Sequence, residues 1–192
     1  LGADPTFFNT DVQHLNAYIY SHIRFPANLI WTLGVSVDSL DHKQLGDFSR
    51  VSPKFGLLWN ITPHTTLRLA ALQTLNRILI TQQTIEPTQV SGFNQFYDDF
   101  DGTKTSRFGI GLDQKISPNW YGGLEISRRK LKVPFADGME TSSEDWHETL
   151  YRAYSNWTPH RTLAASLDYQ FEDFQADGDD TRPPDTATHL LS

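Results

Sequence analysis

Apolar and polar residues alternate with a period of two along most of the chain. In the segment 15–25, the odd positions include Leu15, Ile19 and Ile23, whereas the even positions include Asn16 and His22. Such alternation is typical of a β-strand with one apolar and one polar face. No segment shows a competing apolar stripe of helical period. We therefore predict an all-β, antiparallel, up-and-down protein with at least eight strands.

The alternating segments fall into four pairs, each joined by a short turn built on proline. The four prolines are Pro26, Pro63, Pro118 and Pro159. Proline favours these turns because its ring presets φ for the first corner position. The pattern predicts hairpins over about 12–38, 51–72, 105–128 and 147–172. It predicts long loops over about 39–50, 73–104, 129–146 and 173–186, and the beginning of a ninth strand in the final TATHLLS.

Strand length and the placement of tryptophan favour a transmembrane β-barrel. The alternating arms run for about 9–12 residues, close to the length that crosses a bilayer when tilted. Aromatic residues collect beside the proline turns and form a candidate girdle at head-group height: Trp31, Trp59, Trp120 and Trp157. The alternative is a soluble β-sandwich that binds carbohydrate, in which these four tryptophans would be buried or would line a cleft.

The second face of the strands is polar, rich in glycine and charged in mid-strand. In a barrel this face lines the lumen, and the candidate lumen-facing residues are Lys54, Arg68, Arg107, Asp113, Glu125, Arg152 and Asp168. They would set the electric field that a solute meets. The nearby cations favour charge pairing of the carboxylates over acid–base catalysis. Gly109 and Gly111 fit a crowded lumen, and we expect Arg68→Leu to affect folding only mildly.

Composition excludes several functional classes. The chain of 192 residues contains no cysteine and carries a formal net charge of −7. These values argue against disulfide scaffolds and Cys-ligated zinc, and against a general nucleic-acid binder, which needs a basic face. No run of about 20 apolar residues suggests a membrane helix. The seven histidines lack metal-ligand spacing and no nucleophile signature occurs, so we predict no enzymatic activity, metal site or cofactor.

The predicted long loops collect acidic residues, whereas the proline turns carry cations. Two acidic runs stand out, DDFDG at 98–102 and DGDD at 177–180. Neither has the ligand spacing of a Ca²⁺-binding loop. We interpret them as solvated acids that contact divalent cations bridging lipopolysaccharide. Short turns on one side and long loops on the other are typical of barrels in the bacterial outer membrane.

The segment VSPKFGLLWNITPHTTLRLAA, residues 51–71, resembles the barrel of TonB-dependent outer-membrane receptors. The stretches IEPTQVSGFNQFYDD and RFGIGLDQKISPNWYGGLEIS extend the likeness over about 50–130, and they also resemble receptor-like barrels fused to helical repeats. The resemblance implies an outer-membrane location, contact with lipid and lipopolysaccharide, and a plug or helical-repeat periplasmic domain as partner. It implies no nucleic-acid partner.

Passage or uptake of a solute is the function that this resemblance implies. The alternative is a structural or export component of a larger envelope assembly. Because the chain shows no plug, energy-coupling box or terminal aromatic residue, we expect residues 1–192 to form a single segment of a larger barrel.

Overall fold

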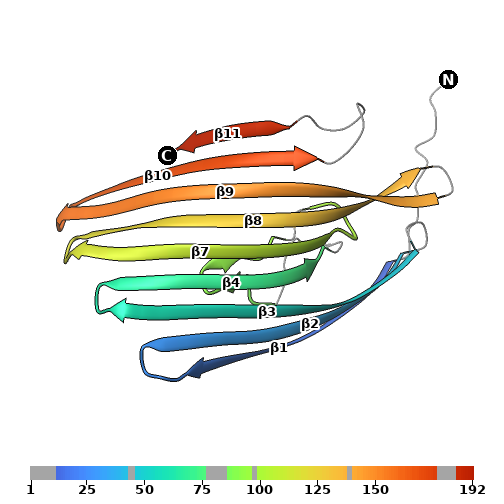
Figure 1. Ribbon diagram of the computed structural model, residues 1–192, viewed down its shortest axis with the longest axis horizontal. Helices are drawn as coiled ribbons and strands as arrows, with labels where there is room; N and C mark the ends of the chain where they lie inside the picture. Colours follow the sequence, from blue (N-terminus) through green and yellow to red (C-terminus); the bar gives the residue numbers. More distant parts are fainter. Residues whose placement is uncertain (1–11, 43–45, 77–85, 97–98, 138–139, 177–184) are drawn as a thin grey trace.

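The computed structural model describes residues 12–42, 46–76, 86–96, 99–137, 140–176 and 185–192. These residues form strands almost throughout (Figure 1). The strands are β1 (Val12–Arg24), β2 (Leu29–His42), β3 (Gly46–Thr62), β4 (Thr65–Leu75), β5 (Gln89–Val90), β6 (Phe93–Asn94), β7 (Lys104–Ser117), β8 (Trp120–Asp137), β9 (Glu140–His160), β10 (Leu163–Ala176) and β11 (Thr186–Leu191). No helix long and apolar enough to cross a membrane occurs in these ranges.

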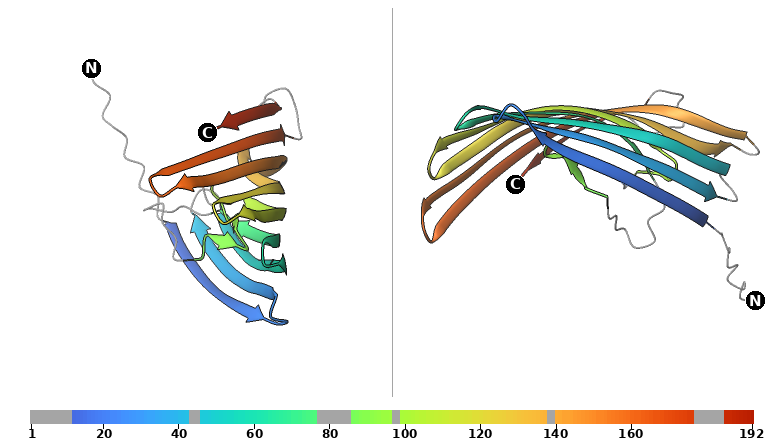
Figure 2. Two further views of the ribbon diagram at one scale, coloured as in Figure 1. Left: turned by 90° about the vertical axis from the view of Figure 1, so that its left-hand side faces the viewer. Right: turned by 90° about the horizontal axis from the view of Figure 1, so that it is seen from below.

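Nine strands form one antiparallel sheet in the order β1-β2-β3-β4-β7-β8-β9-β10-β11, and β5 pairs only with β6. This confirms the predicted all-β, up-and-down arrangement. The predicted ninth strand is also present, because Thr186–Leu191 pairs with β10. The sheet is strongly curved and stays open, with β1 and β11 at its two edges (Figures 1 and 2).

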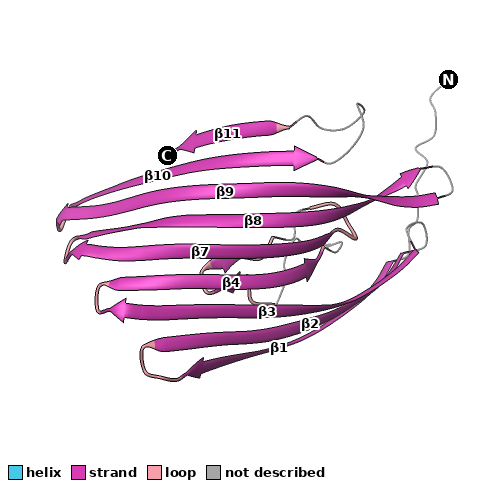
Figure 3. Ribbon diagram, in the orientation of Figure 1, coloured by secondary structure: helices cyan, strands magenta, loops and turns pink. Residues whose placement is uncertain are grey.

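Tight turns connect β1 to β2, β3 to β4, β7 to β8 and β9 to β10 at one end of the sheet, which we call the turn end (Figure 3). We call the opposite end the loop end. Two of the proline turns are held by the hydroxyl that precedes the proline. Thr62 Oγ1 accepts a hydrogen bond of 3.1 Å from His64 N, and Ser117 Oγ accepts one of 3.3 Å from Asn119 N. The predicted turn chemistry is therefore present.

Two of the predicted long loops are wrong. Strand β2 extends to His42 and β3 resumes at Gly46, so most of 39–50 is strand. Strand β8 extends to Asp137 and β9 begins at Glu140, so 129–146 is almost entirely strand. Residues 173–176 likewise belong to β10. The period of two continues here, but polar residues replace apolar ones on the outer face, which weakens the contrast that marks a strand in the sequence.

The two faces of the sheet differ in polarity. Its convex face is apolar and uncovered within the described residues, with Leu15, Ile19, Phe108 and Leu124 more than half exposed, at 71, 69, 65 and 61%. The concave face carries the buried charges and the small hydrophobic core. That core consists of Ala70, Leu72, Val90 and Phe93, and it forms where the β5–β6 hairpin lies against the hollow of the sheet (Figure 2).

Candidate functional site on the concave face

Residues 86–96 fold back over the concave face of the sheet, and we call them the inner segment (Figure 2). Ser91 at φ 50° and Gly92 at φ 84° turn the chain between β5 and β6. Gln95 N closes the hairpin by donating a 2.7 Å hydrogen bond to Thr88 O. The prediction of a long loop over 73–104 is therefore wrong for residues 86–96, which line the hollow of the sheet instead.

The inner segment fits because glycines lie beneath it. A Cβ atom at Gly109 would overlap the ring of Phe93, and one at Gly56 would overlap Ser91 and Val90. Glycine within a strand often marks the close approach of another part of the chain. The interpretation of Gly109 as a small residue at a crowded place on the polar face is confirmed, and the crowding comes from Phe93.

Lys54 anchors the beginning of the inner segment through a buried ion pair with Glu86. Lys54 Nζ also donates a 2.8 Å hydrogen bond to Ser36 Oγ. Tyr20 OH donates to Glu86 Oε1 at 2.7 Å and accepts from Gln95 Nε2 at 3.0 Å. Burial of a charge is costly unless it is paired, so these contacts tie both ends of the inner segment to strands β1 and β3.

Arg68 is the centre of a second buried charge cluster. Its Nε donates to Asp113 Oδ2 at 2.8 Å and its Nη2 donates to Glu125 Oε2 at 3.1 Å. Tyr154 OH hydrogen-bonds the other oxygen of Asp113. The side chains of the arginine and both carboxylates are about nine-tenths buried. One guanidinium thus compensates two carboxylates on neighbouring strands, a geometry for which the planar arginine fork is suited.

Arginines of the sheet alternate with phenylalanines of the inner segment. Phe93 lies between Arg68 and Arg107, with ring-centroid distances of 5.1 and 5.9 Å to the two guanidinium carbons. Phe96 lies between Arg107 and Arg129 at 4.9 and 4.6 Å. These distances are within the range of cation–π attraction. The alternation ties the aromatic side of the inner segment to β4, β7 and β8.

The other two arginines of this series, Arg107 and Arg129, are held by further polar contacts. Arg107 donates to Asn94 O at 2.8 Å and to Ser127 Oγ at 2.7 Å. Arg129 pairs with Asp99 at 3.3 Å and donates to Glu148 Oε1 at 3.0 Å. Asp99, interpreted from the sequence as a solvated loop acid, is therefore a partner of the polar face. Asp98 and the run at 177–180 lie outside the described residues.

All seven sequence-predicted polar-face residues lie on the concave face, where five of them contribute to the two buried charge clusters. Those five are buried: Lys54, Arg68, Arg107, Asp113 and Glu125. Arg152 and Asp168 form a separate, more exposed pair with an Nε–Oδ2 distance of 2.9 Å. The three carboxylates are charge-paired as expected, but Asp113 and Glu125 pair with Arg68, and of the neighbouring cations Lys115, Arg129 and Arg152 only Arg152 takes part, through Asp168.

Sequence reasoning missed the partners that the inner segment and β1 contribute. These are Tyr20, Glu86, Phe93 and Phe96. Phe93 and Phe96 stand in a stretch without strand alternation, so no periodic signal marks them. The mid-strand glycines were the available signal, because a strand that gives up a side chain leaves room for another segment.

The concave cluster is suited to holding the inner segment in place. The carboxylates of Asp113, Glu125 and Glu86 are engaged by cations or hydroxyls. Among the described residues, no group of three or more His, Asp or Glu side chains could hold a metal ion.

The four candidate girdle tryptophans lie near the turn end of the sheet. Trp120 is the register partner of Trp157, and Trp31 and Trp59 lie on the neighbouring strands β2 and β3. Three of them are 39 to 51% exposed. Trp31 Nε1 donates to Phe25 O and Trp120 Nε1 to Ser155 Oγ, both at 2.9 Å, so each ring keeps an apolar body outside and a satisfied polar edge.

No protein-family model matches the chain, and a search of curated protein sequences found no match either. The likeness to TonB-dependent receptors thus rests on the residues quoted for it, and its consequences are proposals.

Proposed function

We propose that this chain is part of a transmembrane β-barrel of the bacterial outer membrane that serves solute passage or uptake. The observation that carries the proposal is the inverted polarity of the sheet. A soluble protein buries its apolar face, but here the apolar convex face is exposed and the charged concave face is buried. Lipid outside and a polar lumen inside account for this arrangement.

The placement of the tryptophans supports the barrel over the soluble sandwich. The sandwich expects these residues to be buried or to line a cleft. Three of the four are more than a third exposed on the outer side of the sheet, and Trp120 and Trp157 also line an open apolar hollow there. Exposed indole rings near one end of the strands are typical of the membrane interface, and the N–H groups of Trp31 and Trp120 are satisfied by hydrogen bonds. In this arrangement the turn end faces the periplasm.

Within such a barrel, the inner segment narrows the lumen. It covers the hollow of the sheet over β3, β4 and β7, where its two phenylalanines insert between arginines. Because the lumen charges pair with one another, a solute would meet a weaker electric field than seven unpaired charges would produce. That pairing favours the second candidate function, a structural or export barrel in an envelope assembly.

Membrane fractions of the native cell provide the first test of location. Detection of this chain in the outer membrane, with a gel mobility that changes on boiling, is the expected result, because folded barrels resist detergent until heated. An apparent mass well above 21.9 kDa after boiling indicates a larger barrel. Recovery in the soluble fraction without a heat-dependent shift would contradict the proposal.

Permeability separates solute passage from the structural alternative. We expect the double substitution Phe93→Ala and Phe96→Ala to increase the swelling rate of vesicles that contain the full-length protein, because it removes two rings from the lumen. Phe108→Ala is the matched control, since Phe108 lies on the convex face of β7. Equal swelling rates for both variants and the unchanged protein would favour the structural role.

A domain outside this chain distinguishes the two family-based alternatives. We propose a plug domain in the intact protein if it takes up solute, and helical repeats if it serves assembly or export. Determining the intact polypeptide by mass spectrometry of the purified protein separates these outcomes.

A further inference from the structure

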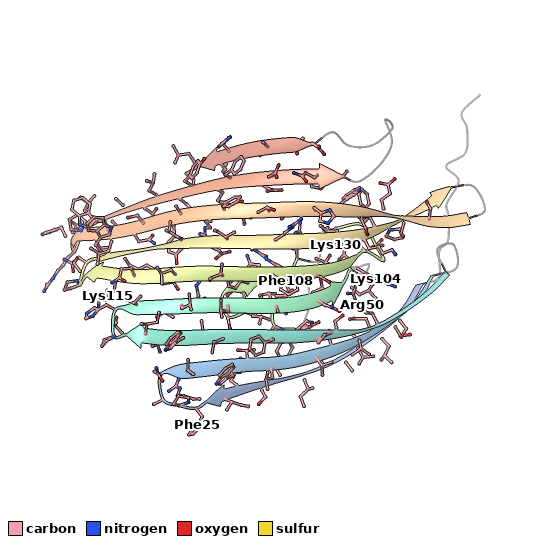
Figure 4. All side chains as sticks on the ribbon, in the orientation of Figure 1. Phe25, Arg50, Lys104, Phe108, Lys115 and Lys130 are labelled. Atoms are coloured by element: carbon pink, nitrogen blue, oxygen red, sulfur yellow. The ribbon has the colours of Figure 1, made fainter. Side chains whose placement is uncertain are left out.

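A row of cations lies on the convex face of the sheet at the loop end, opposite in sign to the chain's net charge of −7. Beyond Ile126, the convex side of β8 carries Arg128, Lys130 and Lys132. Lys104 of β7 is the register partner of Lys132. All four side chains are exposed, and Figure 4 shows Lys104 and Lys130 near the loop end, with Phe108 closer to the middle of the sheet. We call these four residues the basic row.

The basic row begins where the apolar band ends. Arg128 is the register partner of Phe108, and the next convex pair toward the turn end is Ile110 with Ile126. The alternation of side chains along β7 and β8 places all of these residues on one face. The three cations of β8 cover about 13 Å of strand, at about 6.6 Å between alternate residues. A patch of this size accommodates the head group of one lipid.

The described carboxylates on this face leave most of the positive charge uncompensated. Asp145 pairs with Lys130 at 2.9 Å. Asp173, two strands away from Arg128, accepts a hydrogen bond from Gln175 at 3.0 Å. Within the described ranges, Lys104, Arg128 and Lys132 have no ion-pair partner. Three exposed cations are therefore available to an anion.

We propose that the basic row binds the phosphate group of a lipid in the outer leaflet of the membrane. This inference rests on the proposed membrane-spanning function. Arginine and lysine form short, charge-assisted hydrogen bonds with phosphate oxygens. A lipid is the occupant because its acyl chains would cover Phe108, Ile110 and Ile126 directly below the cations, and a free anion would leave these residues uncovered.

Native mass spectrometry of the full-length protein tests this site. The protein is released from vesicles that contain a phosphorylated glycolipid or the same glycolipid after enzymatic removal of its phosphates. We expect the triple substitution Lys104→Gln, Arg128→Gln and Lys132→Gln to reduce retention of the phosphorylated lipid about tenfold or more. The dephosphorylated lipid should be retained equally by both proteins.

Two further variants make the test specific. Lys115→Gln together with Arg161→Gln removes cations at the turn end and should leave retention unchanged. Asp145→Asn releases Lys130 from its carboxylate and should increase retention. Equal retention by the triple variant and the unchanged protein would overturn the proposed site, as would displacement of the lipid by millimolar inorganic phosphate.

Failure of the proposed lipid site can be distinguished from failure of the proposed membrane function. Before lipid analysis, each variant is checked for insertion into vesicles and for heat-dependent gel mobility. Insertion with unchanged lipid retention contradicts only the lipid site, whereas lack of insertion by the unchanged protein contradicts the membrane function itself.

Discussion

At the scale of single residues, the decisive feature is the burial of paired charges on the concave face. Arg68 is shared by Asp113 and Glu125, and Lys54 is paired with Glu86. Such pairs contribute little net stability when intact, but removal of one partner leaves an uncompensated buried charge. These residues therefore specify how the strands and the inner segment come together, and their substitution has consequences that an exposed ion pair would not have.

Arg68→Leu is expected to lower the free energy of unfolding by about 3–5 kcal/mol, because Asp113 and Glu125 then lose their shared cation. This replaces the mild effect expected from the sequence alone. Denaturant unfolding of the full-length protein in vesicles measures it. Arg152→Leu is the matched control, since its side chain is 38% exposed, and its cost should stay near 1 kcal/mol. Equal costs at both positions would refute the role assigned to burial.

At the scale of elements, the inner segment depends on features of the strands beneath it. Gly56 and Gly109 provide space, and arginines of β4, β7 and β8 contact its phenylalanines. The convex sides of the same strands carry apolar residues instead. Each strand is thus constrained on both faces, by the inner segment on one side and by the outer surroundings on the other.

Gly109→Leu should displace the inner segment, because the new side chain would occupy the position of the Phe93 ring. Hydrogen exchange of a peptide spanning residues 86–96 should then accelerate, since exchange reports local opening. Ala71→Leu adds similar bulk on the opposite face of the neighbouring strand, next to Phe108, and should leave this exchange unchanged. Unaltered exchange in Gly109→Leu would show that the segment does not depend on this space.

At the scale of the whole molecule, the sheet leaves backbone hydrogen-bonding groups unpaired along its two edge strands. Among the described residues, strands β1 and β11 each pair with a neighbour on one side only. Within a bilayer, unpaired backbone N–H and C=O groups cost several kcal/mol each, so a spanning sheet must close. The curvature of the sheet in Figure 2 is consistent with closure through additional strands.

If the sheet closes in the membrane, the backbone amides of β1 that point away from β2 are hydrogen-bonded to a further strand in the intact protein. We therefore expect their hydrogen exchange in vesicles to be as slow as that of central strand β4. Hydrogen exchange with residue resolution makes this comparison, and residues 46–62 of β3 serve as an internal reference. Rapid exchange restricted to alternate residues of β1 would show an open edge and contradict closure.

By itself, the sequence determined which segments are strands, where most tight turns fall and which side of each strand is apolar. A period of two and a proline turn are local properties, so they can be read without knowing what a strand contacts. Polar outer residues beyond the apolar band concealed the ends of β2, β3, β8 and β9. Only the tertiary structure decided that residues 86–96 cover the hollow of the sheet, that Arg68 serves two carboxylates and that four cations meet across β7 and β8. Those features depend on register between strands and on contacts distant in sequence, which no local pattern encodes.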